Sequence, residues 1–249
     1  MNENKSFAIL IPSCDNYSDL WDILAESYKK FWPNCTFNKY IILNSGRETP
    51  NLFMPINVWP DIDWSSNCIK ALSQIPEDNI IMNIDDLILS NYINEEELLP
   101  ILQSFEENHY DYLKLINIGN EHKKEAFIKT KSDAPYRTST IFSVWKKDVL
   151  LDILKVWESP WEFEVNGTPR SKDYNNWYYT SKTQVEHENL VIKWVIERWA
   201  LKKLKNVWLE YTGNRDTMSL SKNIKHDLEC LVYSLILKLP SWQSKKLIE

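Results

Sequence analysis

The chain opens with three short apolar runs that alternate with three amphipathic segments. The apolar runs are bounded by turn-forming or polar residues, as buried strands are, and they lie at 7–12, 38–43 and 79–84. The amphipathic segments carry apolar residues at helical spacing and lie at 19–32, 64–75 and 94–108. Strands that alternate with helices form parallel sheets covered by helices on both faces. The pattern therefore predicts an α/β fold with a mostly parallel central sheet flanked by helices.

After residue 110 the pattern is less regular. Apolar runs at 111–116 and 137–145 predict two further strands, and helical spacing over 147–157 predicts a helix. Two polar stretches, 117–135 and 165–184, indicate long loops. Long loops in compact domains are usually functional lids or disordered segments.

The C-terminal end combines an amphipathic helix, expected at 226–242, with basic residues. We divide the chain into a body, 1–221, and this helical tail, 222–249. The helix either docks on the body or lies on a membrane surface, where anionic lipid attracts lysines. The lysines around it are Lys222, Lys225, Lys238, Lys245 and Lys246.

Composition narrows the class of protein. With 249 residues, 43% of them hydrophobic, and a net charge of -6, the chain is globular and lacks the charge of a nucleic-acid binder. Its four cysteines are widely spaced, and no apolar run approaches the roughly 20 residues of a membrane span. We therefore expect free thiols, no structural zinc and a cytoplasmic location. No glycine precedes Gly46, which disfavours Rossmann dehydrogenases, P-loop enzymes and sugar nucleotidyltransferases.

The strongest candidate for chemistry is the acidic pair Asp85 and Asp86, which ends the third predicted strand. Burying an unpaired carboxylate is costly, so both side chains must be exposed, hydrogen-bonded or bound to a metal. A hard divalent cation would satisfy them and would also neutralise a diphosphate. The alternative is that one of them caps a turn or a helix.

Other polar residues lie at predicted strand ends. Asp15 follows the first strand, where it would bond a base or a ribose, or else cap the next helix together with Ser18. Arg137 and Ser139 open a predicted strand and would reach a phosphate or acceptor hydroxyls, unless they are ordinary strand-edge residues. His187 is a candidate metal ligand, although an isolated histidine is more often structural.

Three acids and two aromatic residues gather in the segment ESPWEFE, at 158–164. Ser159 and Glu162 fit a capping box with a proline at the first helical position. In the functional interpretation, Glu162 or Glu164 is a general base in an apolar cleft, where desolvation raises the pKa of a carboxyl group. Trp161 would then offer a face for a sugar ring.

Taken together, these segments resemble a family of bacterial GT-A-like glycosyltransferases from capsule and O-antigen clusters. The matching pieces occur in the family's order within residues 7–164. They are SCDNYSDLW, FWPNC, the spacing of Trp64 and Leu72, NIDDLIL, RTSTIFSVWKKDVLL and ESPWEFE. The resemblance implies a GT-A-like, Rossmann-like fold and a nucleotide-sugar donor, expected to be a UDP-sugar. It also implies Mn²⁺ or Mg²⁺ at a DxD-type site.

The resemblance also implies roles for individual residues. The motif is Asn83-Ile84-Asp85-Asp86 here, which favours Asp86 on the metal and Asp85 on the metal or the ribose. Asp15 would bind the nucleotide. Glu162 and Glu164 would lie by the acceptor, as the base of an inverting enzyme or as positioning groups in a retaining one.

The implied function is transfer of a sugar from a nucleotide-sugar to a hydroxyl of a glycan acceptor in bacterial surface polysaccharide synthesis. The implied acceptor is a growing, lipid-linked glycan, which a basic tail at the inner membrane surface would suit. Two alternatives stay open: a sugar nucleotidyltransferase, and a non-catalytic carbohydrate-binding protein on a transferase fold.

Overall fold

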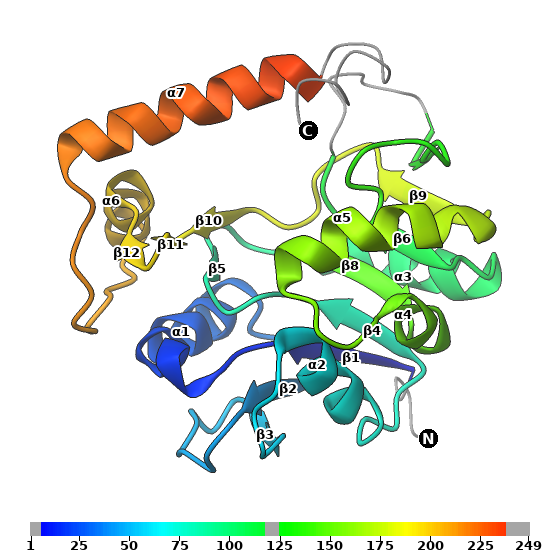
Figure 1. Cartoon of the computed structure of the whole chain (residues 1–249), viewed down its shortest axis with the longest axis horizontal. Coiled ribbons are helices and arrows are strands. Elements are labelled where there is room, and N and C mark those ends of the chain that lie inside the picture. The colour runs from blue at the N-terminus through cyan, green and yellow to red at the C-terminus, as the bar shows by residue number, and fades with distance from the viewer. Residues whose placement is uncertain (1–5, 118–124, 238–249) are drawn as a thin grey trace.

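A mixed eight-stranded sheet forms the centre of the computed structural model, which describes residues 6–117 and 125–237, with side chains up to residue 232 (Figure 1). Six strands run in one direction, and only β7 and β8 run against their neighbours. The spatial order is β3 (Met54–Asn57), β2 (Asn38–Leu43), β1 (Phe7–Ile11), β4 (Asn79–Met82), β8 (Ser143–Lys146), β6 (Tyr112–Lys114), β9 (Trp177–Thr180) and β7 (Phe127–Lys129). The expected mostly parallel α/β sheet is confirmed.

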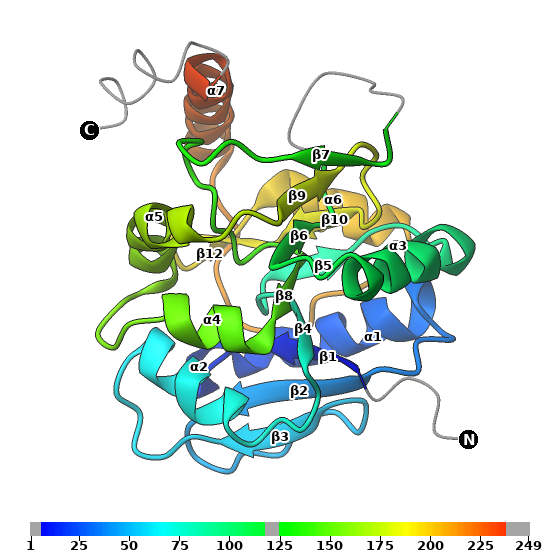
Figure 2. The same cartoon turned by 90° about the vertical axis from the view of Figure 1, so that its right-hand side faces the viewer.

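Helices cover both faces of this sheet (Figure 2). The helices are α1 (Trp21–Phe31), α2 (Trp64–Leu72), α3 (Glu95–Glu107), α4 (Lys147–Ile153), α5 (Pro160–Arg170), α6 (Arg198–Asn206) and α7 (Leu220–Leu237). Two hydrophobic clusters form the core, one containing side chains of α1 and α3 and the other containing side chains of α2, α4 and α5. Strand β1 supplies both clusters alternately, Ile9 to the first and Leu10 to the second, because successive strand residues point to opposite faces.

Small elements lie beside the main sheet. Two short antiparallel pairs form, β5 (Leu87–Leu89) with β10 (His187–Asn189), and β11 (Val191–Ile192) with β12 (Val195–Ile196). A 3-10 helix, Asp15–Leu20, leads into α1. Within the part of the chain that the structure describes, no helix is long and apolar enough to cross a membrane.

The strand predicted at 137–145 is mostly wrong, because β8 begins only at Ser143. The neighbouring strands β4 and β6 end at Met82 and Lys114, which pair with Ser143, so no ladder continues beyond it. The preceding residues bond helix α5 instead: Thr138 Oγ1 donates to Glu164 O at 2.9 Å. Ser139 is buried, and its carbonyl accepts from Ser143 Oγ at 2.7 Å, so the strand-edge position expected for it is not found.

Arg137 is also buried, and it links three later segments. Its guanidinium donates to the carbonyl of Ser171 and, at 2.7 Å, to that of Tyr174, and it stacks 4.4 Å from the ring of Trp177. Trp177 Nε1 in turn donates to Arg137 O at 2.8 Å. In this position the side chain cannot reach a phosphate without breaking these contacts, so the structure gives it an architectural role.

The loop predicted at 165–184 is wrong over most of its length, because α5 extends to Arg170 and β9 spans Trp177–Thr180. The polar sequence hides these elements, since Gly167 and Pro169 are poor helix formers. Packing overrides propensity here: a Cβ on Gly167 would lie 3.0 Å from Thr138 Oγ1. The capping box alternative for Ser159 and Glu162 is confirmed.

Other boundaries also differ from the predictions. Strand β7 lies inside the loop predicted at 117–135, of which residues 118–124 fall outside the described chain. Helix α7 begins at Leu220, earlier than the expected 226, so the division at 221/222 falls inside it. The part of the predicted helix beyond residue 237 also lies outside the described residues.

We expect Arg137→Ala to lower the free energy of unfolding by roughly 2–4 kcal/mol, because two buried carbonyls lose their donor and Trp177 loses its stacked cation. Urea unfolding at neutral pH measures the change. The exposed Arg47→Ala is the control and should cost less than about 0.5 kcal/mol. Equal effects of the two substitutions would contradict the role given to Arg137.

Candidate functional site

The carboxyl ends of β1, β2 and β4 meet at one edge of the sheet and bring distant polar segments together. Asn83 N donates to Leu10 O at 3.1 Å, so the residues after β4 follow the end of β1. Ser13 Oγ donates to Asp85 Oδ2 at 2.5 Å, and Trp21 Nε1 donates to Ser13 Oγ at 2.8 Å. The sequence predicts that the polar residues after β1 and those after β4 lie at the same edge of the sheet, and the structure confirms this.

Asp85 and Asp86 are two adjacent carboxylates with little access to water. Asp85 is 7% exposed, and burial, followed by the charge of Asp86, raises its pKa well above the usual value, against the lowering effect of the Ser13 hydrogen bond. Burial likewise raises the pKa of Asp86 to about 6. Asp86 Oδ1 is buried and accepts no hydrogen bond within the described chain. Neither side chain caps a helix, but both residues lie in the turn after β4 and each carboxyl group has a hydrogen bond with its own backbone that lowers its pKa, so the turn-cap alternative stays open.

One guanidinium lies close enough to influence both aspartates. The positive charge of Arg215 lowers the pKa of each carboxyl group. Arg215 is held by a bidentate contact with Asp19, at 2.8 Å from Nε and 2.9 Å from Nη2. Tyr211 Oη donates to the same carboxylate at 2.5 Å. The chain after α6 therefore closes back over the N-terminal segment.

Two aromatic rings complete this side of the site. Tyr17 and Trp194 have ring centroids 5.3 Å apart, and Arg215 lies 4.5 Å from the first ring and 5.8 Å from the second. Burial raises the pKa of Tyr17 to about 12, and the charges of Asp85 and Asp86 add to the effect. The phenol is therefore neutral and close to the acidic pair.

Asp15 lies at the same edge but pairs with the segment after β2. Its Oδ1 accepts from Asn44 N at 3.0 Å, and its own amide donates to Asn44 Oδ1 at 3.1 Å. Desolvation raises its pKa, but hydrogen bonds from Ser45 and Asn44 outweigh that effect and hold the pKa below the usual value. The capping alternative is not found, because the 3-10 helix that follows has no side-chain cap.

Glu162 and Glu164, the two candidate bases, have different environments. Glu162 is exposed, and its carboxylate accepts from Ser159 N at 2.8 Å, a backbone hydrogen bond that lowers its pKa. The apolar cleft expected around Glu162 is therefore wrong. Glu164 is half-buried, and its Oε1 accepts from Thr140 N at 2.7 Å and Thr140 Oγ1 at 3.0 Å. Trp161, on the first turn of α5, is exposed.

A second group of polar side chains surrounds Glu164. Lys114 ends β6, and burial lowers the pKa of its amine while the charge of Glu164 opposes that effect. His187 lies on β10, 5.1 Å from the ring of Phe142, and its Nδ1 is buried with no partner among the described residues. Burial lowers the pKa of the imidazole, a hydrogen bond with the backbone of Val185 opposes that effect, and the charge of Lys114 adds to it.

No ready-made cage of three metal ligands exists here. In the described ranges 6–117 and 125–237, no three His, Cys, Asp or Glu side chains are grouped so as to hold a metal ion. A site on Asp85 and Asp86 thus needs ligands from a substrate or from water. The place of His187 in that site stays a prediction.

Five residues of this edge were not singled out from the sequence: Ser13, Tyr17, Lys114, Thr140 and Arg215. Ser13 and Tyr17 flank Asp15, so their segment was already implicated. Lys114 offered a weak signal as a charged residue within an apolar run. The sequence around Arg215 carried no signal of a functional role. Only the fold brings Arg215 beside Asp19, which lies 196 positions earlier in the chain.

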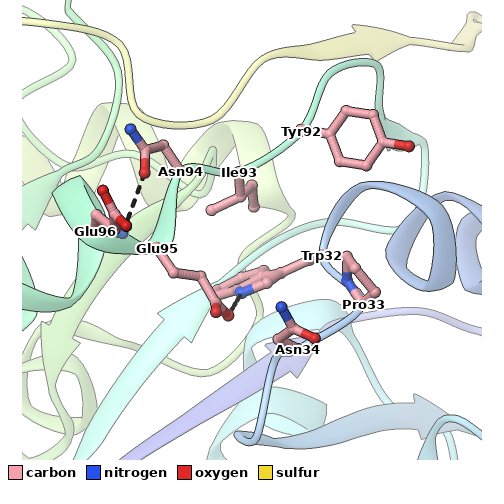
Figure 3. A pocket seen from close by; sticks show the side chains of 8 residues that line it. All are labelled: Trp32, Pro33, Asn34, Tyr92, Ile93, Asn94, Glu95 and Glu96. Carbon is pink, nitrogen blue, oxygen red and sulfur yellow. Dashed lines mark hydrogen bonds between the residues drawn. The ribbon is translucent and has the colours of Figure 1, made fainter.

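A pocket of about 340 Å³ lies elsewhere, at the junction of the end of α1 and the start of α3 (Figure 3). Its lining includes Trp32 and Glu95, which are joined by a 2.8 Å hydrogen bond from the indole Nε1. Trp21, which touches the acidic site through Ser13, is at the opposite end of α1. The pocket is separate from the acidic pair and contributes none of its residues.

The sequence matches no protein-family model and no curated protein. Among solved structures, the fold is similar to S. aureus TarS (14% identity, TM-score 0.47), to a mycobacterial protein (9%, 0.46) and to the galactosyltransferase LgtC in complex with donor and acceptor sugar analogues (11%, 0.40). These matches cover 70%, 75% and 70% of this chain, and 36%, 68% and 72% of the other chains. The chain thus spans about a third of the length of TarS.

We expect Asp86→Asn to stabilise the metal-free protein. Above about pH 6 the wild-type carboxylate is charged and poorly hydrated, and the rise of its pKa from 3.8 to about 6 corresponds to a penalty on the order of 3 kcal/mol. The advantage of the variant should shrink as the pH falls below 6, because the wild-type group then takes up a proton. Urea unfolding across this range measures it. The exposed Asp22→Asn is the control, and a destabilised Asp86→Asn would contradict the account.

Asp19→Asn should have the opposite effect. The largest single influence, desolvation, raises the pKa of Asp19, but hydrogen bonds from Arg215 and Tyr211 outweigh it and hold the pKa below 3.8. Its stabilising contribution is therefore full above that pH and is lost as the pH falls through the folded-state pKa. We expect a loss of roughly 1–3 kcal/mol near pH 7 that disappears in acid. A loss that does not depend on pH would exclude the ion pair as its cause.

Proposed function

We propose that this protein is a metal-dependent, GT-A-like glycosyltransferase that moves a sugar from a nucleotide-sugar donor to a hydroxyl of a glycan acceptor. The observation that carries the proposal is the pair Asp85 and Asp86: Asp85 is buried, Asp86 is half-buried, and Oδ1 of Asp86 is buried without a partner among the described residues. Such a pair is unfavourable by itself and becomes favourable when a cation shares it. A functional site is the usual place for groups of raised pKa.

The residues present fit Mn²⁺ or Mg²⁺. These hard cations take oxygen ligands, and Mg²⁺ is usually held by one or two carboxylates together with substrate phosphates. Asp86 has a free oxygen to offer, and Asp85 retains lone pairs beyond its bond to Ser13. When bound, the cation would neutralise the negative charge that develops on a departing nucleotide diphosphate.

Residues that follow β1, together with Arg215, would surround a bound nucleotide-sugar. The rings of Tyr17 and Trp194 offer flat faces for a nucleobase, and we propose that the base of a UDP-sugar stacks there. Arg215 adds positive charge beside the acidic pair, where a diphosphate would lie. Asp15, kept ionised by its hydrogen bonds, would accept from the base or the ribose.

Glu164 is the stronger candidate for the base of an inverting reaction. Thr140 fixes one of its carboxylate oxygens, while the charge of Lys114 lies nearby. The other oxygen would take the proton of the acceptor hydroxyl as the hydroxyl oxygen bonds the anomeric carbon. The bond from that carbon to the diphosphate breaks, and the electron pair leaves with the nucleotide diphosphate. Trp161 would offer a face to the acceptor sugar.

We propose a place for this reaction in bacterial surface polysaccharide synthesis, with a hexose as the transferred sugar and a lipid-linked glycan as acceptor. The support is the ordered set of sequence segments within 7–164 together with the acidic pair. A sugar nucleotidyltransferase and a non-catalytic carbohydrate-binding protein are the alternatives that the following experiment separates.

A screen of nucleotide-sugars for metal-dependent release of nucleotide diphosphate tests the proposal. We expect at least one donor, a UDP-sugar first, to be turned over with Mn²⁺ or Mg²⁺ and to be inert with a chelator. Asp86→Asn should lower the rate by about 10²-fold or more, and Glu164→Gln should lower kcat by a similar factor if it is the base. Asp22→Asn and Glu162→Gln, which alter exposed carboxylates, should leave kcat within about twofold.

Three results would count against the proposal. Full activity of Asp86→Asn would exclude the metal assignment. Release of pyrophosphate from a nucleoside triphosphate and a sugar phosphate would identify a nucleotidyltransferase. Carbohydrate binding without turnover of any donor would identify a non-catalytic protein.

A further inference from the structure

Helix α7 presents its apolar side to solvent. Four side chains at a regular spacing of four residues form a ridge along it, each 48–57% exposed: Leu220, Ile224, Leu228 and Val232. Residues four apart lie on the same helix face, so the ridge is continuous. No side chain of α7 within the described range belongs to either hydrophobic cluster. We call this set the α7 ridge.

The polar side of the same helix makes the contacts with the body. Asn223 is fully buried, and its Oδ1 accepts from Arg198 N at 3.0 Å. Asp227, one turn later, accepts from Trp199 Nε1 at 3.0 Å. Figures 1 and 2 both show α7 standing apart from the layers that pack on the sheet, near α6 only at its first turns. A helix docked for stability would bury its apolar face, so this orientation points to a separate binding role.

The distribution of charged residues along the chain indicates which kind of partner binds the α7 ridge. Residues 198–249 contain ten Lys and Arg but five Asp and Glu, a balance of +5. The preceding 197 residues contain 19 Lys and Arg and 30 Asp and Glu, a balance of -11. Within α7 itself Lys222 and Lys225 are balanced by Asp227 and Glu229, so the excess of basic residues lies in the segments before and after the helix, in a protein that is otherwise acidic. Such a combination favours an anionic lipid surface over a second copy of the same chain.

Neighbouring aromatic and basic side chains support the same partner. Helix α6, joined to α7 by the contacts of Arg198 and Trp199, carries Lys202 and Lys205 exposed, and Trp208 follows it with 86% exposure. Tryptophan and lysine are the residues that gather at membrane interfaces. The described helix is not a membrane span, which suits a helix that lies on a surface.

We propose that the α7 ridge binds the surface of an anionic membrane, with the lysines around it meeting the lipid headgroups. This goes beyond the proposed function and does not rest on it. Arg215 lies five positions before the start of α7, so a bound helix would hold the acidic site close to the lipid surface.

Cosedimentation of the full chain with lipid vesicles tests the proposal. We expect binding to vesicles that contain about one-third phosphatidylglycerol, weak binding to pure phosphatidylcholine, and a decline as NaCl rises from about 0.05 to 0.5 M. Ile224→Ser with Leu228→Ser should lower the partition coefficient about tenfold or more. Lys222→Gln with Lys225→Gln should lower it about fivefold to thirtyfold.

Matched control variants distinguish membrane binding by the α7 ridge from the proposed enzymatic function and from self-association. Lys131→Gln with Lys172→Gln removes the same charge from exposed sites outside 198–249 and should bind vesicles within about twofold of the wild type. Asp86→Asn should also bind normally, and the ridge variant should keep its turnover of donor in solution. Equal binding to neutral vesicles, or unchanged binding of the ridge variant, would overturn the proposal. Self-association that the ridge variant abolishes, without lipid binding, would identify a second copy as the partner.

Discussion

The two adjacent carboxylates of the site have little access to water, and burying their charge costs free energy. The arrangement of residues around this edge of the sheet depends on how that free-energy cost is offset. The backbone leaves β4 with Asn83 bonded to Leu10 and, through its side chain, to the hydroxyl of Tyr28. These contacts fix where the next residues point. Trp21 then orients Ser13, which donates to Asp85, while one oxygen of Asp86 has no donor within the described chain. The described residues thus give Asp85 a hydrogen-bond donor and leave one oxygen of Asp86 without one, and in the function proposed above a cation would supply the missing compensation.

The C-terminal part of the chain is physically coupled to this edge. The ion pair of Asp19 and Arg215 is flanked by Tyr211 and by the ring of Tyr17, so a segment far along the sequence stabilises the site's border. Burial raises the pKa of both aspartates and the charge of Arg215 opposes that rise, so the same contact that closes the fold also tunes the acidic pair. Anything that holds α7 in place would therefore also restrain the border of the site.

The sequence predicts the first half of the fold well and the second half poorly, for identifiable reasons. In the first 110 residues, strands and helices are buried on clear faces, so their periodicity shows in the chain. The edge formed by Ser13, Asp15 and Asp85 follows from strand order alone. Strand β9 and helix α5 are hidden by polar and helix-breaking residues such as Gly167, since packing rather than propensity stabilises them. Arg137 shows the same limit, because nothing in its neighbourhood along the chain marks it as buried.

Calorimetric titration of UDP into the protein, with Mn²⁺ and with a chelator, tests the central claim most directly. We expect binding that requires the metal and that is lost in Asp86→Asn while the variant remains folded. Metal-independent binding of UDP, or binding that Asp86→Asn leaves intact, would contradict the claim that this carboxylate pair exists to share a cation with a nucleotide diphosphate.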